Sequence, residues 1–314
     1  MPPRKFFSIF FIFLLSGTLL TSCSRGSTQL QIEPKNSYYQ FVDDLGNTVF
    51  LEKKPERIIS TYGSYAETWL LSGGTLVGVT DDVLSERKLD ISPMPIIIGK
   101  VKTPNIESIL ALKPDFVLLS ANIPAQIALS DTLTKAGIAH AYFRVEHFKD
   151  YLCMLNILTD ITGRKDLYQK NGVDVEQRIQ AILKNFKPKV ANPSVLAVRC
   201  FSSNAKPLAA DTMVNVMLKE LGADNVITHT PSLLSDLSLE KILEEDPSYI
   251  LAVPMGNVDQ AQKEMKQNFE TNPSWKDLAA VKENHYIFLP KELFHYKPNA
   301  HWDESYAYLA NLLS

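Results

Sequence analysis

One stretch of the sequence, residues 165–186, sets the plan of the whole chain. Its apolar residues recur near helical spacing between polar ones, and Pro188 closes the segment, so the sequence predicts a long amphipathic helix despite Gly172. On both sides of this stretch, short apolar runs alternate with helical patterns, which is typical of α/β structure. We therefore expect two α/β lobes joined by a single long helix, with a ligand cleft between the lobes.

The first two dozen residues have the pattern of a secretory signal. Arg4 and Lys5 precede the apolar run 6–15, and the sequence LTSC at 20–23 resembles a bacterial lipobox. That resemblance implies that Cys23 becomes a lipidated N-terminus; an ordinary cleaved signal and a single-span anchor are the alternatives. The expected organisation is a signal peptide at 1–22, a flexible tether at 23–38, an N-terminal α/β lobe with a crossing helix at 39–163, a spine helix at 164–188 and a C-terminal α/β lobe at 189–314.

Charge and cysteine content narrow the classes of partner. Thirty-two basic and 35 acidic residues give a net charge of −3, which does not favour a nucleic-acid partner or an anionic membrane surface. Cys153 lies in an apolar helical pattern and Cys200 ends an apolar strand, so we expect two separate buried thiols, with a single disulfide as the alternative.

A short helical pattern at 105–112 is followed by the sequence LKPD at 112–115 and an apolar strand. Pro104 fixes φ at the start of this helix, Asn105 is positioned to cap it, and Glu107 faces outward in the first turn, where a negative charge favours the helix dipole. The second half of the chain repeats this plan, with Glu240 in a short helix, then Pro247 and an apolar strand. Either glutamate alone is an ordinary surface charge, but the repetition pairs them across two lobes.

These motifs resemble substrate-binding proteins that serve importers of ferric siderophores, haem and cobalamin, and the resemblance spans roughly residues 40–313. It implies two Rossmann-like lobes and a monomer outside the cytoplasm, lipid-anchored to a bacterial membrane in a periplasm or on the outer face of the cell. The partners that it implies are the permease subunits of an ABC importer with a separate ATPase. Glu107 and Glu240 would dock to arginines of that permease.

The resemblance also implies the ligand, a small metal chelate. A ferric siderophore ranks first, a corrinoid second and haem third, because the sequence DDVL at 81–84 lacks the tyrosine that haem binders of this family often have there. The candidate ligand contacts come from two kinds of place: strand ends that carry basic or aromatic residues, and the loop 293–302, which is rich in aromatic and basic residues. The candidates are Tyr62, Lys100, Lys102, Arg144, Arg199, Lys206, His295, Tyr296, His301 and Trp302, with Lys297 as a further cation of the same loop.

No pattern in the sequence favours a metal centre, a cofactor or catalysis. The six histidines are scattered without an HExxH motif or a zinc-type Cys/His spacing, and GxGxxG, GxxxxGK[ST] and GxSxG motifs do not occur in their required contexts. We therefore expect neither a bound metal nor an enzyme. The alternatives are an enzyme of similar fold and a sensory or structural lipoprotein. Ligand-stimulated uptake through a permease would distinguish a transport component from a sensory or structural lipoprotein.

Overall fold

The computed structural model describes residues 37–235 and 237–314. The expected signal peptide, Cys23 and nearly all of the tether lie outside this part of the chain. Tyr38, the last residue of the expected tether, already belongs to the folded body, because its hydroxyl donates to the carbonyl of Ile161 at 2.9 Å. Within the described ranges no helix is long and apolar enough to cross a membrane.

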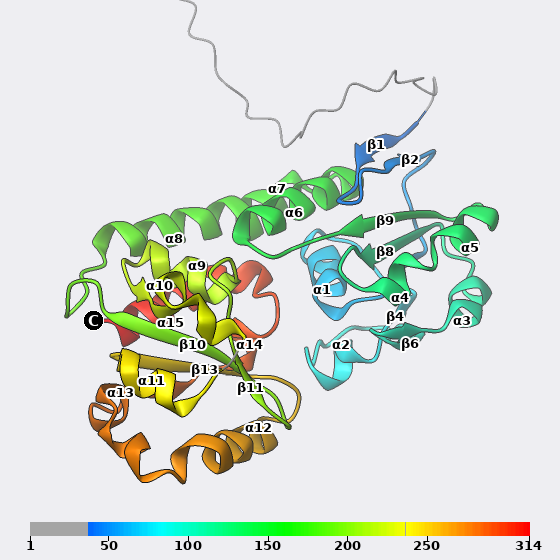
Figure 1. Cartoon of the computed structure of the whole chain (residues 1–314). Coiled ribbons are helices and arrows are strands. Elements are labelled where there is room, and N and C mark those ends of the chain that lie inside the picture. The colour runs from blue at the N-terminus through cyan, green and yellow to red at the C-terminus, as the bar shows by residue number, and fades with distance from the viewer. Residues whose placement is uncertain (1–36, 236) are drawn as a thin grey trace, which may run out of the picture. The chain divides into compact units, whose positions relative to one another are not determined.

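A five-stranded parallel sheet forms the first lobe (Figure 1). Its strand order is β5-β4-β3-β8-β9, so the strand-helix-strand pairing expected from the sequence is confirmed. The strands of the lobe are β1 Tyr39–Val42, β2 Thr48–Leu51, β3 Ile58–Ser60, β4 Gly78–Val79, β5 Ile96–Ile97, β6 Gly99–Lys100, β7 Thr103–Pro104, β8 Phe116–Ser120 and β9 Ala139–Phe143. The helices are α1 Gly63–Leu71, α2 Asp82–Ser85, α3 Ile106–Ala111, α4 Pro124–Ile127, α5 Ser130–Lys135 and the crossing helix α6 Phe148–Thr162.

The second lobe is built on a sheet of order β11-β10-β13-β14, in which β12 also pairs with β10. All pairings are parallel except the β10–β11 hairpin. The strands are β10 Ser194–Cys200, β11 Ala205–Pro207, β12 Asp224–Asn225, β13 Tyr249–Pro254 and β14 Tyr286–Phe288. The helices are α9 Met213–Glu220, α10 Val226–His229, η2 Pro231–Leu234, α11 Leu239–Glu245, α12 Val258–Met265, η3 Lys266–Glu270, η4 Pro273–Asp277, α13 Ala279–Lys282, α14 Lys291–Phe294, η5 Asn299–His301 and α15 Trp302–Leu312.

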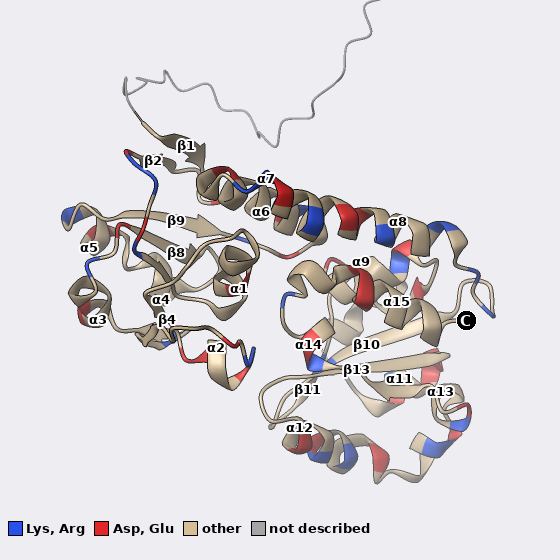
Figure 2. Ribbon diagram, turned by 180° about the vertical axis from the view of Figure 1, so that it is seen from behind, with Lys and Arg blue, Asp and Glu red and all other residues tan. Residues whose placement is uncertain are grey.

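The stretch expected to be a long helix is helical from Lys165 to Asn185. It comprises α7 Lys165–Tyr168, a single π-helical segment η1 Gln169–Val173, and α8 Asp174–Asn185. Val175 and Ile179 are buried on its inner face, while Figure 2 shows acidic and basic residues alternating along α7 and α8. The chain therefore passes between its two sheets through one helical segment, as the periodicity predicts.

Both central strands alternate their side chains between two hydrophobic clusters. In β10, Val195 and Ala197 pack into a cluster that also contains residues of α6, α8 and α15, whereas Leu196 and Val198 pack on the opposite face. β8 divides its side chains in the same way between that shared cluster and a cluster confined to the first lobe. Each sheet is thus buried on both faces, as parallel sheets require, and the shared cluster runs from one lobe to the other beneath the spine.

The repeated motif has the same construction in both lobes. Asn105 caps α3 by accepting from the Ser108 N–H at 2.9 Å, and Ser238 caps α11 by accepting from the Lys241 N–H at 3.3 Å. Glu107 and Glu240 occupy the first turn of these helices and are exposed. The outward position that the sequence predicts for Glu107 is therefore confirmed, and Glu240 matches it.

Candidate functional site

Arg199 lies near the carboxyl end of β10, and its positive charge has no ion-pair partner among the described residues. Its side chain is half-buried, and its Nε atom is buried without a hydrogen-bond partner among the described residues. Burial lowers the pKa of the guanidinium because the charged form loses solvation. A buried donor of this kind is stabilised by an acceptor, and an anionic acceptor also compensates the charge.

His295 and Lys297 follow α14 and lie close enough to Arg199 to share its electrostatic field. Burial, followed by the positive charges of Lys291 and Arg199, lowers the pKa of His295 to about 4, so its imidazole is neutral at neutral pH. Burial also lowers the pKa of Lys297, with Arg199 adding to the effect and Glu146 and Asp150 opposing it. No described residue forms an ion pair with Arg199 or Lys297. These three side chains form the basic cluster of the second lobe.

The first lobe contributes Tyr62 and a carboxylate network near the same region. Tyr62 ends the loop after β3, is half-buried and stacks edge-on against Tyr65 with ring centroids 5.0 Å apart. Asp82 accepts from the Gly63 N–H at 2.7 Å and from the Thr80 hydroxyl at 2.6 Å, so it fixes the start of α1. Burial raises the pKa of Asp82. Asp82 therefore has a structural explanation that does not need a ligand.

Tyr296 connects the basic cluster to the first lobe. Its hydroxyl donates to the Glu86 carboxylate, which also accepts from Lys291 Nζ at 3.0 Å. Arg87, Lys291 and Glu86 were not among the residues selected from the sequence. No local pattern identifies them, because Glu86 and Lys291 are far apart in the chain and their contact depends on how the two lobes meet.

Most of the other candidates are exposed, unlike the half-buried side chains of the basic cluster. Lys100 and Lys102 are exposed on the β6–β7 hairpin, and Arg144 is exposed after β9, where its backbone N–H donates to Asp44. Lys206 lies beside Arg199 across the β10–β11 hairpin but is exposed. His301 is exposed and bonds to Glu304, with 2.7 Å between Nδ1 and Oε1.

Trp302 differs from the other candidates because it is almost completely buried, although its Nε1 atom has no hydrogen-bond partner among the described residues. It is 1% exposed and packs edge-on against Phe148, with ring centroids 5.9 Å apart. Trp302 is the first residue of α15. Its indole packs into the cluster shared by the two lobes, where burial stabilises a large apolar ring. Trp302 is therefore omitted from the proposed ligand contacts.

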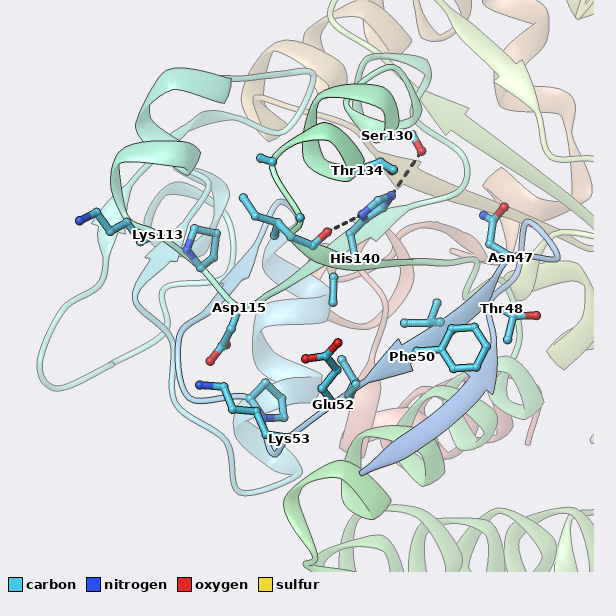
Figure 3. A pocket seen from close by; sticks show the side chains of 18 of the residues that line it. Asn47, Thr48, Phe50, Glu52, Lys53, Lys113, Asp115, Ser130, Thr134 and His140 are labelled. Atoms are coloured by element: carbon cyan, nitrogen blue, oxygen red, sulfur yellow. Dashed lines mark hydrogen bonds between the residues drawn. The ribbon is translucent and has the colours of Figure 1, made fainter. Parts of the chain in front are cut away.

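A hollow of about 770 Å³ on the first lobe contains none of the candidate residues (Figure 3). It lies between β2, the turn before β8 and the α5–β9 connection. Two of the polar side chains that line it are bonded within the lobe: Asp115 accepts from the Glu56 and Arg57 N–H groups at 2.9 and 2.8 Å, and His140 bonds to Ser130 and to the Ile138 carbonyl. The cations of this lining, Lys53 and Lys113, are exposed, whereas Arg199 and Lys297 are half-buried, so the basic cluster is the stronger ligand site.

Metal-ligating side chains do not gather in the part of the chain that the structure describes. No group of three His, Cys, Asp or Glu residues there is arranged to hold a metal ion. Neither Cys153 nor Cys200 forms a disulfide among the described residues. Cys200 is buried and Cys153 half-buried, and burial raises the pKa of Cys200 to about 12. The expectation of two separate cysteines is confirmed, although only Cys200 is fully buried.

Two α/β lobes with largely parallel sheets are joined by one helical segment, and a half-buried arginine without an ion-pair partner among the described residues lies at a strand end. This arrangement is typical of a two-lobed binding protein. The family model described as "Periplasmic binding protein" matches residues 58–293. The chain belongs to this family.

Relatives and solved structures agree with that assignment. The Iron-uptake system-binding protein of Bacillus subtilis is 28% identical over 199 residues, which cover 62% of this chain and 61% of the relative. The High-affinity heme uptake system protein IsdE of Staphylococcus aureus is 23% identical over 96% of this chain and 95% of its own length. The crystal structure of the triscatecholate siderophore binding protein FeuA from B. subtilis, complexed with ferri-bacillibactin, superposes with a TM-score of 0.64 at 22% identity, covering 87% of this chain and 96% of FeuA.

Proposed function

We propose that the protein is the extracytoplasmic substrate-binding component of an ABC importer and that it captures an anionic ferric chelate. The observation that carries this proposal is the pair of half-buried cations, Arg199 and Lys297, without ion-pair partners among the described residues. A ligand with several negative oxygens supplies the missing acceptors. The names of the B. subtilis relatives, which refer to iron uptake and a siderophore, support the same ligand class.

No bond of the ligand is broken in this role. Arg199 and Lys297 bind the anionic groups, and neutral His295 offers a hydrogen bond without adding charge. Tyr62 offers an aromatic face from the first lobe. The family consists of binding proteins, and the absence of any recognised catalytic motif in the sequence is consistent with a transport role.

Calorimetric titration with ferri-bacillibactin tests the proposal directly. We expect saturable binding that weakens by about 10- to 100-fold in Arg199→Met and in Lys297→Met, because each charged hydrogen bond contributes about 1.5–3 kcal/mol. Lys219→Met, which removes an exposed cation from α9, should leave the affinity unchanged. Equal losses in all three variants, or no binding by any ferric siderophore, would contradict the proposal.

Haem, which ranks third from the sequence, becomes the second candidate ligand through one specific observation. The imidazole of His295 is neutral at neutral pH, which is the form that binds iron, and the S. aureus relative is named for haem uptake. Binding of haem with a shifted Soret band that is lost in His295→Gln, together with silence toward ferri-bacillibactin and cobalamin, would select haem and keep the transport role.

We also propose that Cys23 carries a lipid anchor and that the mature protein is a monomer. The support is the LTSC sequence at 20–23, followed by a polar segment that leads to the folded body. Cys23→Ala should release the protein from membranes in a fractionation experiment and should abolish incorporation of labelled fatty acid. Membrane retention of this variant would indicate a spanning anchor instead.

A further inference from the structure

The segment 295–299, here called the strap, belongs to the second lobe but is held by the first. At its start, the Glu86 carboxylate accepts from Lys291 Nζ at 3.0 Å and from the Tyr296 hydroxyl. Burial alone would raise the pKa of Glu86, but the bonds from Tyr296 and Lys291 outweigh that effect and the pKa is lowered. Glu86 is thus ionised and bonded to two groups from the other lobe.

The far end of the strap is fixed by a second carboxylate. Asn299, only 1% exposed, donates from Nδ2 to the Ser64 carbonyl at 3.0 Å and to Glu67 Oε2 at 2.8 Å. Glu67 also forms an ion pair with Arg87, whose side chain is 8% exposed. The same carboxylate therefore holds a residue of each lobe, and its surroundings exclude most solvent.

The middle of the strap is held through its backbone. Arg87 Nη1 donates to the Lys297 carbonyl at 2.8 Å, and its guanidinium lies 5.7 Å from the centre of the Tyr296 ring. His295 and Lys297, two members of the basic cluster, are carried between these attachments. The first lobe thus determines where side chains of the second lobe are placed.

We propose that Glu86 and Glu67 are positioning residues for ligand binding: from the first lobe they hold the strap so that His295 and Lys297 face the same site as Arg199. This inference rests on the proposed ligand site and goes beyond it, because neither carboxylate contacts the ligand. Their effect on affinity is exerted through the order of the strap. A strap that is already fixed loses less conformational freedom when a ligand binds.

Hydrogen–deuterium exchange on the ligand-free full chain tests the attachment without any ligand. The His295 and Tyr296 N–H groups donate to the Lys291 carbonyl at 2.9 and 3.0 Å, so their exchange reports the order of the strap. We expect Glu86→Gln to speed exchange of the peptide spanning 292–301 by about fivefold or more, since local opening then costs less free energy. Asp166→Asn, which breaks the exposed Arg164–Asp166 pair, is the matched control and should leave that peptide unchanged.

Two further variants separate positioning from loss of stability. Glu86→Lys combined with Lys291→Glu restores a pair of opposite charges and should return exchange to within about twofold of the wild type. Asn299→Gly keeps a residue suited to the left-handed backbone at φ 54° while removing the amide, and should speed exchange as Glu86→Gln does. Unchanged exchange in both Glu86→Gln and Asn299→Gly would overturn the inference.

Binding kinetics with ferri-bacillibactin complete the test. In Glu86→Gln we expect dissociation about 10-fold faster with little change in association, the pattern usual for interface changes that leave the encounter intact. The exchanged-charge variant should restore the slow dissociation. An unaltered dissociation rate in Glu86→Gln would reject positioning, even if exchange rises. If the wild type binds no ferric chelate, the proposed function fails, while the exchange experiment still decides whether the strap is attached.

Discussion

At the scale of single residues, Arg199 and Lys297 are half-buried without ion-pair partners among the described residues, which costs free energy of folding. Each loses hydration, and the lowered pKa values of both side chains express that loss. Replacing them with apolar residues would relieve this cost, so their presence is better explained by a ligand than by the stability of the fold. An anionic ligand that binds there is therefore expected to raise the free energy of unfolding, by an amount that grows with the logarithm of its concentration divided by its Kd.

His295 makes the free energy of unfolding depend on pH, because its burial and the neighbouring cations lower its pKa. Its pKa is about 4 in the folded protein against an ordinary value of 6.5, so between these values the unfolded chain binds more protons than the folded one. Stability is thus fully present above pH 6.5 and declines as the pH falls toward 4. We expect the free energy of unfolding of the wild type to fall by about 3 kcal/mol more than that of His295→Gln over this interval, measured by urea denaturation. Equal pH dependence in the wild type and His295→Gln would show that His295 titrates in the folded state as it does in the unfolded chain.

At the scale of elements, the packing of the π-helical segment 169–173 explains why Gly172, a poor helix former, lies within the long helix. A Cβ on Gly172 would lie 3.0 Å from Leu152 Cδ2 and 3.2 Å from Leu155 Cδ2, so glycine permits close packing of the spine on the crossing helix α6. Nearby, the Tyr151 hydroxyl donates to the Asn171 carbonyl at 2.9 Å, and Asn171 Nδ2 donates to the Leu71 carbonyl at 2.8 Å. The segment joins the spine to α6 and α1.

Gly172→Leu should therefore destabilise the protein. Forcing extra carbons into this contact is expected to lower the free energy of unfolding by about 1–3 kcal/mol, as overpacking usually does. Chemical denaturation followed by circular dichroism measures the change. Gln177→Leu, at an exposed position of α8, is the comparison and should change stability by less than about 0.5 kcal/mol. Similar stability of the two variants would mean that the helices separate easily here.

Elements of this chain were predictable where their signal is local. The helix at 165–186 follows from its periodicity, and the cap at Asn105 follows from its side chain and the preceding Pro104. The left-handed backbone of Lys113 and Asp246, each directly before a proline, has no such local signal. Proline disfavours the right-handed helical region for the residue before it, and the tight turn into β8 or β13 sets the conformation that is adopted.

The candidate site was only partly predictable, for a related reason. Arg199 and His295 were selected because a strand end and an aromatic, basic loop are each recognisable in one segment. Glu86, Glu67 and Asn299 were missed because their roles arise only when the two lobes meet. The burial of Trp302 has no signal in the sequence, because an aromatic residue at a loop-to-helix junction looks the same whether it faces a ligand or the core.

At the scale of the whole folded body, the cluster shared by both lobes limits how far they can move apart. Leu155 of α6, Val175 of α8, and Met217 and Leu309 of the second lobe are all buried in it. Opening the lobes widely would expose part of this surface at about 25 cal/mol per Å² of apolar area. We therefore expect modest closure on ligand binding, with the strap contacts rather than a large hinge motion adjusting the site.

The two exposed glutamates carry the last prediction, because their equivalence is a property of the whole molecule. From Glu107 to the left-handed Lys113, and from Glu240 to the left-handed Asp246, the spacing along the chain is identical, and each turn leads into a central parallel strand. Two equivalent acidic helix starts suit a two-fold permease with basic sites.

We propose that Glu107→Ala combined with Glu240→Ala abolishes chelate uptake by cells while calorimetric affinity for the chelate stays within about twofold of the wild type. Asp131→Ala with Asp259→Ala removes exposed first-turn acids from α5 and α12 and should leave uptake intact. Lost affinity in the Glu107 and Glu240 variant would place these residues in ligand binding, and normal uptake would remove them from docking.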